Sequence, residues 1–346
     1  MQVNGYGALS KTAPIAPIDF ERREVGADDI LVDIMYCGVC HSDIHMARSE
    51  WGPSVYPIVP GHEIVGRVSE IGNNVTKFKV GDLAGVAVFV DSCRTCPSCQ
   101  SGMEQYCDEG MTPTYNGFYR DGVTPTFGGY SSKYVIDEKY ALHIPFTDQL
   151  EAVAPLLCAG ITTYSPLRFA GVGKGHKVAV LGLGGLGHMA VKFAASFGAE
   201  VTMLSTSPSK EADARRLGAQ HFVLTTDEAQ MKPLKNHFDF ILNTVSAVHD
   251  LNSFLDLLKV EGKMLLVGIP PEDHKVAADK LISKRRSIVG SMIGGIQETQ
   301  EMLDYCAEHN IVSDVEVIAM KDINEAYDRI LKSDVKYRFV IDMKTL

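Results

Sequence analysis

A glycine-rich loop at residues 182–187 constrains the fold of this chain more than any other feature. It reads Gly-Leu-Gly-Gly-Leu-Gly, follows an apolar run at 177–181 that is typical of a buried strand, and precedes a helical pattern at 187–197. In this context glycines let backbone N–H groups approach a pyrophosphate at the positive end of a helix. A tight turn that binds no ligand is the alternative. The residues expected to bind a dinucleotide are Gly182, Gly184, Gly185, Leu186 and Gly187.

Strand and helix patterns alternate through the second half of the chain. Besides the two elements beside the loop, strands are expected at 201–205, 238–242 and 263–268, and a helix at 209–217. This alternation predicts an α/β fold of the Rossmann type, a doubly wound parallel sheet with helices on both faces. A helix is also expected to begin at 147–151, with Thr147 or Asp148 as its N-cap.

The first 150 residues have a different character. Short β-like runs, such as 30–34 and 64–68, are punctuated by glycine and proline, which indicates a compact, mostly β domain. A chain of 346 residues is also too long for one ordinary core. We therefore expect a β-rich domain of residues 1–154 completed by 292–346, and a dinucleotide domain at 155–291. The last segment, with a helix near 297–308 and a strand at 338–341, is expected to return to the first domain.

The end of the second strand in the dinucleotide domain indicates which nicotinamide cofactor is bound. Enzymes that use NAD place Asp or Glu there, where the carboxylate binds the ribose hydroxyls. Residues 204–210 read Leu-Ser-Thr-Ser-Pro-Ser-Lys and contain no carboxylate, so nothing repels a 2′-phosphate. Ser205, Thr206 and Lys210 offer hydroxyl groups and a point charge to that phosphate, which favours NADP(H). The alternative is an ordinary polar loop.

Four of the eight cysteines lie close together in the sequence, at Cys93, Cys96, Cys99 and Cys107. Four soft thiolates in one short loop fit a closed, tetrahedral Zn²⁺ site, which has no open position and therefore holds a loop rather than performing chemistry. In a chain of this length such crowding favours metal binding in a reducing compartment over a disulfide framework. Four free thiols or two disulfides are the alternatives.

Charge and hydropathy argue against several classes of partner. The formal net charge of −10 disfavours nucleic acid. No apolar run approaches the roughly 18–20 residues needed to span a bilayer, and the first residues lack the basic and then apolar pattern of a signal peptide. We therefore expect a cytoplasmic protein that acts on a small molecule, with no membrane association.

Further candidates for metal ligation are dispersed along the chain, and spacing alone does not choose among them. Residues 40–45 read Cys-His-Ser-Asp-Ile-His, residues 61–63 read Gly-His-Glu, and the four-cysteine loop and Cys158 follow in that order. With these motifs the chain resembles the zinc-containing medium-chain alcohol dehydrogenases over nearly its whole length. The segments 51–63 and 157–164 are most similar to the cinnamyl alcohol dehydrogenase branch of that family.

The resemblance implies that the β-rich domain is a GroES-like catalytic domain with a second zinc site. As is general for alcohol dehydrogenases, the implied ligands are two cysteines and one histidine, here Cys40, His62 and Cys158, with one position left open. Glu63 would be a nearby carboxylate or a transient ligand, and Asp43 would accept a hydrogen bond from the ring N–H of His62. A buried salt bridge is the alternative for both carboxylates. Cys37 and Cys306 match no ligand position and are expected in the core.

The same resemblance implies hydride transfer between an alcohol or aldehyde and the cofactor, with zinc acting as a Lewis acid. Ser42 would take the hydroxyl proton during oxidation and pass it through the ribose hydroxyl to His45 and then to water. A surface histidine is the alternative for His45. His41 occupies a position where relatives often carry Arg for the pyrophosphate, and Thr162 matches a position that packs at the nicotinamide end.

The substrate pocket is expected to be aromatic. The resemblance places Trp51 and Phe89 in its lining, with Ile293 closing the other side, although each is alternatively a core residue. We therefore expect a broad reductase of bulky apolar or aromatic aldehydes and, by family analogy, a homodimer joined through the nucleotide domains.

Two other classes of function compete with this interpretation. An NAD-dependent polyol or secondary-alcohol dehydrogenase is disfavoured by Ser205. A non-catalytic zinc or nucleotide binder, or a zinc-free enoyl reductase of the same fold, would lack zinc ligands or the relay, all of which the sequence retains.

Overall fold

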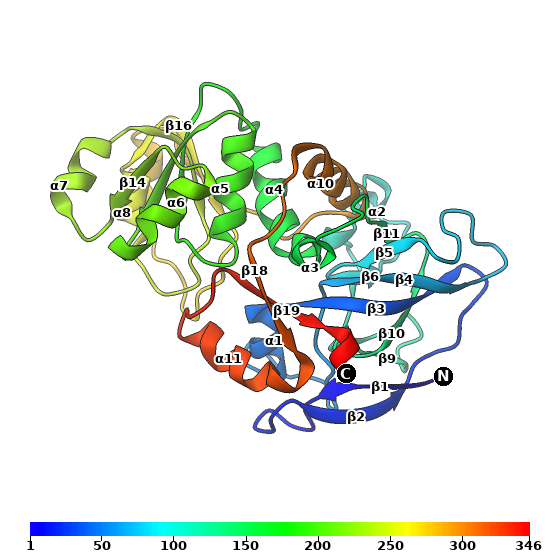
Figure 1. Ribbon diagram of the computed structural model, residues 1–346. Coiled ribbons are helices and arrows are strands. Elements are labelled where there is room, and N and C mark those ends of the chain that lie inside the picture. The colour runs from blue at the N-terminus through cyan, green and yellow to red at the C-terminus, as the bar shows by residue number, and fades with distance from the viewer. The chain divides into compact units, whose positions relative to one another are not determined.

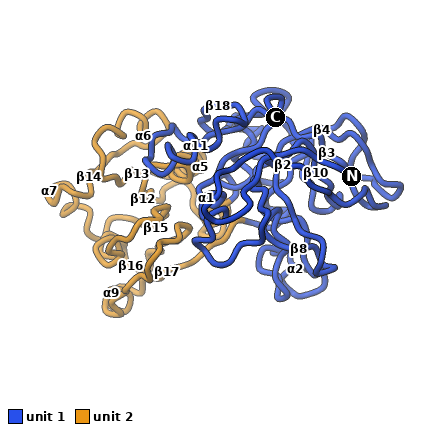
Figure 2. The backbone as a smooth tube through the Cα atoms, turned by 90° about the horizontal axis from the view of Figure 1, so that it is seen from below, with its two compact units in different colours: residues 1–161, 294–346 blue, residues 162–293 orange.

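The computed structural model describes all residues, 1–346, and the chain divides into two compact units. Unit 1 comprises residues 1–161 and 294–346, and unit 2 comprises residues 162–293 (Figure 2). No helix is both long and apolar enough to cross a membrane.

Unit 2 is built on a six-stranded sheet in the order β14-β13-β12-β15-β16-β17, and every neighbouring pair is parallel. The strands are β12 Lys177–Leu181, β13 Glu200–Ser205, β14 His221–Leu224, β15 Phe238–Asn243, β16 Leu258–Leu266 and β17 Ser287–Gly290. This order is that of the dinucleotide-binding Rossmann sheet, in which the chain reverses direction across the sheet after its third strand. The predicted doubly wound α/β fold is therefore confirmed.

Helices follow the strands of unit 2 and cover the apolar sheet. They are α5 Gly187–Ser196, α6 Glu211–Leu217, α7 Glu228–Met231 and α8 Leu251–Leu255, labelled in Figure 1, and α9 Ala278–Ile282, labelled in Figure 2. The core between sheet and helices includes Leu181, Leu204, Ile241 and Phe254. The central strand β12 is apolar and buried after its first residue, as is typical of a parallel sheet covered on both faces.

Unit 1 is a mostly antiparallel β structure. Its main sheet has seven strands in the order β11-β5-β4-β3-β19-β18, with β10 pairing β3. They are β3 Asp29–Val39, β4 Ile64–Ile71, β5 Leu83–Val86, β10 Lys133–Asp137, β11 Leu142–His143, β18 Val315–Ala319 and β19 Arg338–Asp342. Three small hairpin sheets complete the strands: β1 Gln2–Gly7 with β2 Ala16–Glu21, β6 Phe89–Asp91 with β7 Thr112–Pro113, and β8 Gly117–Phe118 with β9 Pro125–Thr126.

The last strand returns to the first domain, as predicted. β19 lies antiparallel to β3, with Phe339 opposite Val39, so the red end of the chain lies beside its blue beginning (Figure 1). The helices of this unit are α1 His41–Ala47, α2 Pro97–Gln100, α3 Leu150–Val153, α10 Ile296–His309 and α11 Ile323–Leu331, and α4 Ala159–Phe169 begins in unit 1 and ends in unit 2.

One helix boundary was predicted wrongly. The helix expected to be capped by Thr147 or Asp148 begins at Leu150, and its N-cap is Gln149, which makes no side-chain capping bond. Gln149 has a left-handed backbone with φ of 52°, so the chain turns into α3 through backbone geometry instead of a polar cap.

Candidate metal centres and dinucleotide loop

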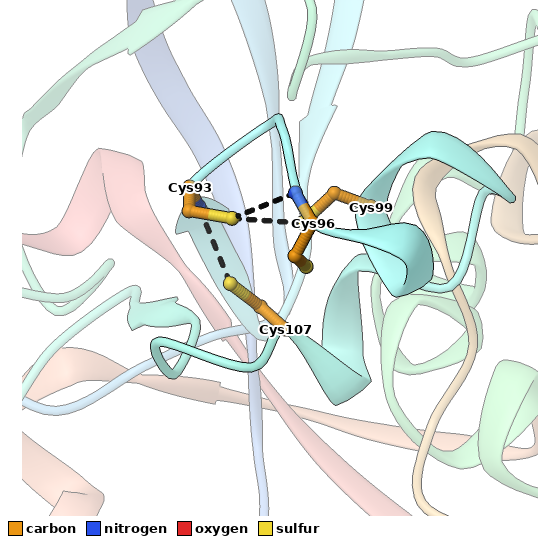
Figure 3. Close-up of side chains that lie close together, drawn as sticks. All are labelled: Cys93, Cys96, Cys99 and Cys107. Atoms are coloured by element: carbon orange, nitrogen blue, oxygen red, sulfur yellow. Dashed lines mark hydrogen bonds between the residues drawn. The ribbon is translucent and has the colours of Figure 1, made fainter.

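The four clustered cysteines converge on one point in unit 1. Cys93 follows β6, Cys96 and Cys99 belong to the start and body of α2, and Cys107 ends the short 3₁₀ helix Glu104–Tyr106. Their sulfur atoms all lie within 4.8 Å of one another, and Figure 3 shows the side chains gathered in one loop. Four thiolates bound tetrahedrally at about 2.3 Å from one zinc ion are about 3.8 Å apart. The Sγ atoms of Cys93 and Cys99 are 3.8 Å apart, and all eight cysteines are free thiols, so the geometry fits zinc and not disulfides.

Hydrogen-bond donors near these sulfur atoms stabilise the thiolate form. The backbone N–H of Cys96 donates to Sγ of Cys93, and that of Cys93 donates to Sγ of Cys107, each at 3.3 Å (Figure 3). Backbone N–H groups of Thr95 and Cys96 lower the pKa of Cys93 to about 6. The Arg120 guanidinium also donates a hydrogen bond to Sγ of Cys107 at 3.6 Å. No local sequence motif predicted this contact.

A second cluster joins residues that are far apart in the sequence. Cys40, His62, Glu63 and Cys158 are all buried, and their ligand atoms lie within 4.8 Å of one another. Cys40 is the N-cap of α1, His62 and Glu63 directly precede β4, and Cys158 lies at the junction of the 3₁₀ helix Ala154–Leu157 and α4. The two sulfurs are 4.0 Å apart. The structure therefore brings together the three residues predicted as ligands and the carboxylate beside them.

Asp43 is the hydrogen-bonding centre beneath this cluster. Its fully buried carboxylate accepts the backbone N–H of Cys40 at 2.9 Å and, at 3.1 Å each, the backbone N–H of Gly61, the hydroxyl of Tyr130 and Nδ1 of His62. The bond to Nδ1 leaves Nε2 of His62 free to face a metal, which is the usual arrangement of a carboxylate, a histidine and zinc. Although burial opposes it, Asp43 raises the pKa of His62 well above its usual value.

Arg338 is a member of this site that sequence reasoning missed. It comes from β19, forms an ion pair with Glu63, and approaches Sγ of Cys40 to 4.0 Å, although both carboxylate and guanidinium are almost completely buried. Burial raises the pKa of Glu63 to about 7, against the opposing effect of Arg338. The second oxygen of Glu63, Oε2, is buried without any partner. Oε2 lies against Gly38, where an added Cβ would be 1.9 Å from it, so the donor set itself carries the fit to a metal ion: two thiols and an imidazole, all within 4.8 Å of one another.

Three of the four glycines in the glycine-rich loop of unit 2 have different structural roles. Gly182 follows β12 with a φ of 91°, a conformation that favours glycine. A Cβ on Gly187 would lie 1.9 Å from the carbonyl oxygen of Gly182, so this glycine permits the close packing of strand and helix. A Cβ on Gly184 would meet no protein atom within 4 Å, which leaves an open position where a ligand can approach the backbone. The loop therefore fits a bound pyrophosphate, with Gly185 and Leu186 partly exposed beside it.

The residues expected to select the cofactor lie at the end of β13. Lys210 donates from Nζ to the carbonyl of Leu183 at 2.8 Å, which places its ammonium group against the glycine-rich loop. Ser205 is buried and accepts the N–H of Ser207 at 3.2 Å, whereas Thr206 is exposed. Thr244 was missed by sequence reasoning, although its hydroxyl donates to the carbonyl of Leu181 at 2.9 Å and braces the turn.

Comparison with known proteins identifies the family. Residues 26–146 match the alcohol dehydrogenase GroES-like domain, and residues 185–308 match the zinc-binding dehydrogenase domain. The chain is 54% identical over 348 aligned residues to aldehyde reductase YahK of Escherichia coli (strain K12), covering 100% of this chain and 99% of that protein. It belongs to the zinc-containing medium-chain alcohol dehydrogenases, in their cinnamyl alcohol dehydrogenase branch.

Two further relatives are similar over the whole chain. NADP-dependent alcohol dehydrogenase C 1 of Mycolicibacterium smegmatis is 55% identical, covering 99% of both chains. The crystal structure of the cinnamyl alcohol dehydrogenase of Helicobacter pylori complexed with NADP(H) is 45% identical, covers 99% of both chains and has a TM-score of 0.93. These matches confirm the predicted GroES-like and Rossmann domains of this alcohol dehydrogenase.

The expected relay residues of the dehydrogenase lie on one short helix beside its buried cluster. In α1, the Ser42 hydroxyl lies 3.5 Å from Sγ of Cys40. His45, one turn further on, holds the Glu50 carboxylate 2.5 Å from its Nδ1 and stacks between His41 and Trp51, at 4.7 and 4.6 Å between ring centroids. Trp51 is 42% exposed, so part of its aromatic surface remains accessible beside His45.

The other expected pocket and cofactor residues have mixed placements. Phe89 is only 1% exposed and packs edge-on against Tyr140, so its place in the substrate pocket stays a prediction. Thr162 and Ile293 belong to unit 2, and each is 8% exposed. Ile293 has a φ of 39°, which is rare for a β-branched residue.

Proposed function

We propose that this alcohol dehydrogenase interconverts bulky apolar or aromatic aldehydes and their primary alcohols with NADP(H). The observation that carries the proposal is the buried set of Cys40, His62 and Cys158, whose ligand atoms lie within 4.8 Å of one another, in a chain that also contains the open backbone at Gly184. We also infer two zinc ions per chain, a cytoplasmic enzyme and a homodimer. The family supports the homodimer only by analogy.

The residues present fit the two groups that such chemistry needs. Zinc held by Cys40, His62 and Cys158 would polarise the substrate oxygen as a Lewis acid, and the nicotinamide cofactor would donate or accept the hydride. The chain itself orients the histidine through Asp43, whose bond to Nδ1 fixes the ring. Arg338 offsets the charge of Glu63 and of the Cys40 thiolate, because it contacts both side chains.

The chain also supplies groups that move a proton between the substrate and water. In the oxidation direction Ser42 is the proposed acceptor of the hydroxyl proton, and His45 passes that proton to solvent. Glu50 next to Nδ1 of His45 favours the tautomer with a proton on Nδ1, so Nε2 is the free acceptor. In the reduction direction the same groups deliver the proton.

Two observations support the cofactor and substrate choices. Lys210 lies against the glycine-rich loop, and no carboxylate occurs between residues 204 and 210 to repel a 2′-phosphate. The relatives described above include an enzyme named NADP-dependent and a structure with NADP(H). The accessible aromatic surface of Trp51 favours a flat, apolar substrate.

The test is an initial-rate comparison with benzaldehyde or cinnamaldehyde and either NADPH or NADH, with and without a chelator. We expect a strong preference for NADPH and loss of activity on zinc removal. The variant Ser205→Asp places a carboxylate at the end of β13 and should reverse the cofactor preference without loss of zinc. Equal rates with both cofactors would contradict the NADP(H) proposal, and no turnover by fully zinc-loaded protein would contradict the catalytic one.

A further inference from the structure

The four-cysteine loop contacts a part of unit 1 that is far away in the sequence. The chain leaves unit 2 at Ile293 and re-enters unit 1 at Gly294, and α10 begins two residues later at Ile296, with Gly295 as its N-cap. The first N–H groups of any helix have no acceptor within that helix. The start of α10 lies beside the cysteine loop (Figure 1), and the loop supplies this acceptor: Oε2 of Glu104 accepts the N–H of Ile296 at 3.2 Å.

The contact is tight as well as polar. A Cβ on Gly295 would lie 1.9 Å from the carbonyl oxygen of Gly102 and 2.7 Å from Oε2 of Glu104, so the two backbones approach each other more closely than any residue other than glycine allows. A negative carboxylate at this position also faces the positive end of a helix of 14 residues.

Glu104 is fixed by the metal-binding segment itself. It lies between Cys99 and Cys107, and its carbonyl accepts the N–H of Cys107 at 3.0 Å. The carbonyl of Cys99 in turn accepts the N–H of Gly102 at 3.2 Å. A metal that fixes both cysteines therefore fixes the backbone on both sides of the carboxylate.

Ile293, three residues before α10, needs support of this kind. Ile293 has a left-handed φ of 39°, which a β-branched residue adopts only where its surroundings hold it. The rest of α10 has an independent anchor, because Gln300 exchanges two hydrogen bonds with the backbone of His143, at 2.8 and 3.1 Å. The first turn is therefore the part of the helix that depends on Glu104.

We propose that Glu104 is a positioning residue through which the four-cysteine zinc loop fixes the start of α10 and the return of the chain after Ile293. The structural zinc site would thus set the conformation of a segment that contains none of its ligands. This inference concerns the link between two parts of unit 1 and does not depend on the substrate or on the choice of cofactor.

The test is amide hydrogen exchange of peptides covering residues 291–300 in the zinc-loaded protein. Glu104→Ala should speed exchange in the first turn of α10 by at least about tenfold, because a hydrogen bond to a charged acceptor is lost. Glu104→Gln, which keeps an acceptor oxygen, should recover part of the protection. Asp108→Asn is the matched control, since Asp108 is an exposed carboxylate of the same segment.

Linkage provides a second measurement, because a coupling between two sites acts in both directions. Glu104→Ala should also speed the release of one zinc per chain to a competing chelator, whereas Asp108→Asn should not. If Glu104→Ala does not retain zinc during purification, Glu104→Gln gives the same comparison. The proposal would be overturned if amide exchange at 295–299 stayed within twofold of wild type in both Glu104 variants. It would also be overturned if the control variant accelerated exchange equally. Since neither readout measures turnover, failure here is distinct from failure of the proposed activity.

Discussion

Replacing Asp43 by Asn tests whether the carboxylate beneath the buried cluster organises the metal site. Asp43 accepts four hydrogen bonds: from the backbone N–H groups of Cys40 and Gly61, from Tyr130 and from His62. An asparagine can keep its oxygen toward Gly61 and His62 only by turning its NH₂ group toward the N–H of Cys40. The Tyr130 hydroxyl can rotate and accept a hydrogen bond from the asparagine NH₂ group. The backbone N–H of Cys40 is only a donor, so it would face another donor and lose its hydrogen bond.

The expected magnitude follows from this arrangement. The variant loses the bond to Cys40 and the charge that strengthens the others, and each hydrogen bond to a charged group is worth about 1.5–3 kcal/mol. We expect the free energy of unfolding to fall by about 3–5 kcal/mol. We also expect the affinity for the zinc at Cys40, His62 and Cys158 to fall about 10–100-fold, since the partner of a ligating histidine is altered.

The assay is chelator competition that resolves two zinc ions per chain, together with denaturant unfolding. Asp29→Asn is the matched control, because Asp29 is a nearly buried carboxylate of the same unit that pairs with Arg23 and the N–H of Gly26, at the opposite end of β3 from Cys40. The control should lower stability while leaving the zinc affinity of the Cys40 cluster unchanged. If Asp43→Asn is destabilised but binds its second zinc within twofold of wild type, Asp43 supports the fold and not the metal site.

Three further predictions concern the dinucleotide loop and the four-cysteine site. Gly187→Ala should lower the free energy of unfolding by about 1–3 kcal/mol in denaturant unfolding, because the added Cβ meets backbone atoms. Gly184→Ala should leave stability unchanged, because its Cβ meets no protein atom, but should weaken NADPH binding at least about tenfold by titration. Lys210→Ala should raise KM for NADPH about tenfold and leave KM for NADH nearly unchanged; an equal effect on both would contradict its assigned role. Arg120→Met should accelerate zinc release to a chelator, whereas unchanged release would show that its contact with Cys107 is incidental.

The features that were predicted correctly from the sequence are local ones. The glycine-rich loop, its flanking strand and helix, and the spacing of the four cysteines each occupy fewer than about 20 consecutive residues, so their chemistry can be recognised without knowing the fold. The parallel sheet followed from a simple alternation of such local patterns. The cluster at Cys40, His62 and Cys158 was found only because the chain resembles a family, since nothing in the spacing of these residues separated them from other cysteines and histidines.

The features that were missed depend on long-range packing. Arg338 pairs with Glu63 across 275 positions, and a single arginine near the end of a chain gives no local sign of burial. The start of α3 was misplaced because Gln149 turns the chain through its backbone conformation, which polar side chains nearby did not indicate.

Strand register explains how these distant residues reach one site. β3 pairs with β4 with Cys37 opposite Ile64, and the N–H of Gly38 donates to the carbonyl of Glu63 at 2.9 Å, so the residues just before β4 lie beside the end of β3 that leads into Cys40. On the other side of β3, Phe339 lies opposite Val39, which brings Arg338 level with Cys40. A slip of one residue in that second pairing would turn Arg338 to the opposite face of the sheet. Glu63 would then be buried without its counter-charge, which is strongly destabilising. The antiparallel pairing of the first and last long strands of unit 1 is therefore part of the chemistry of the buried cluster as well as of the fold.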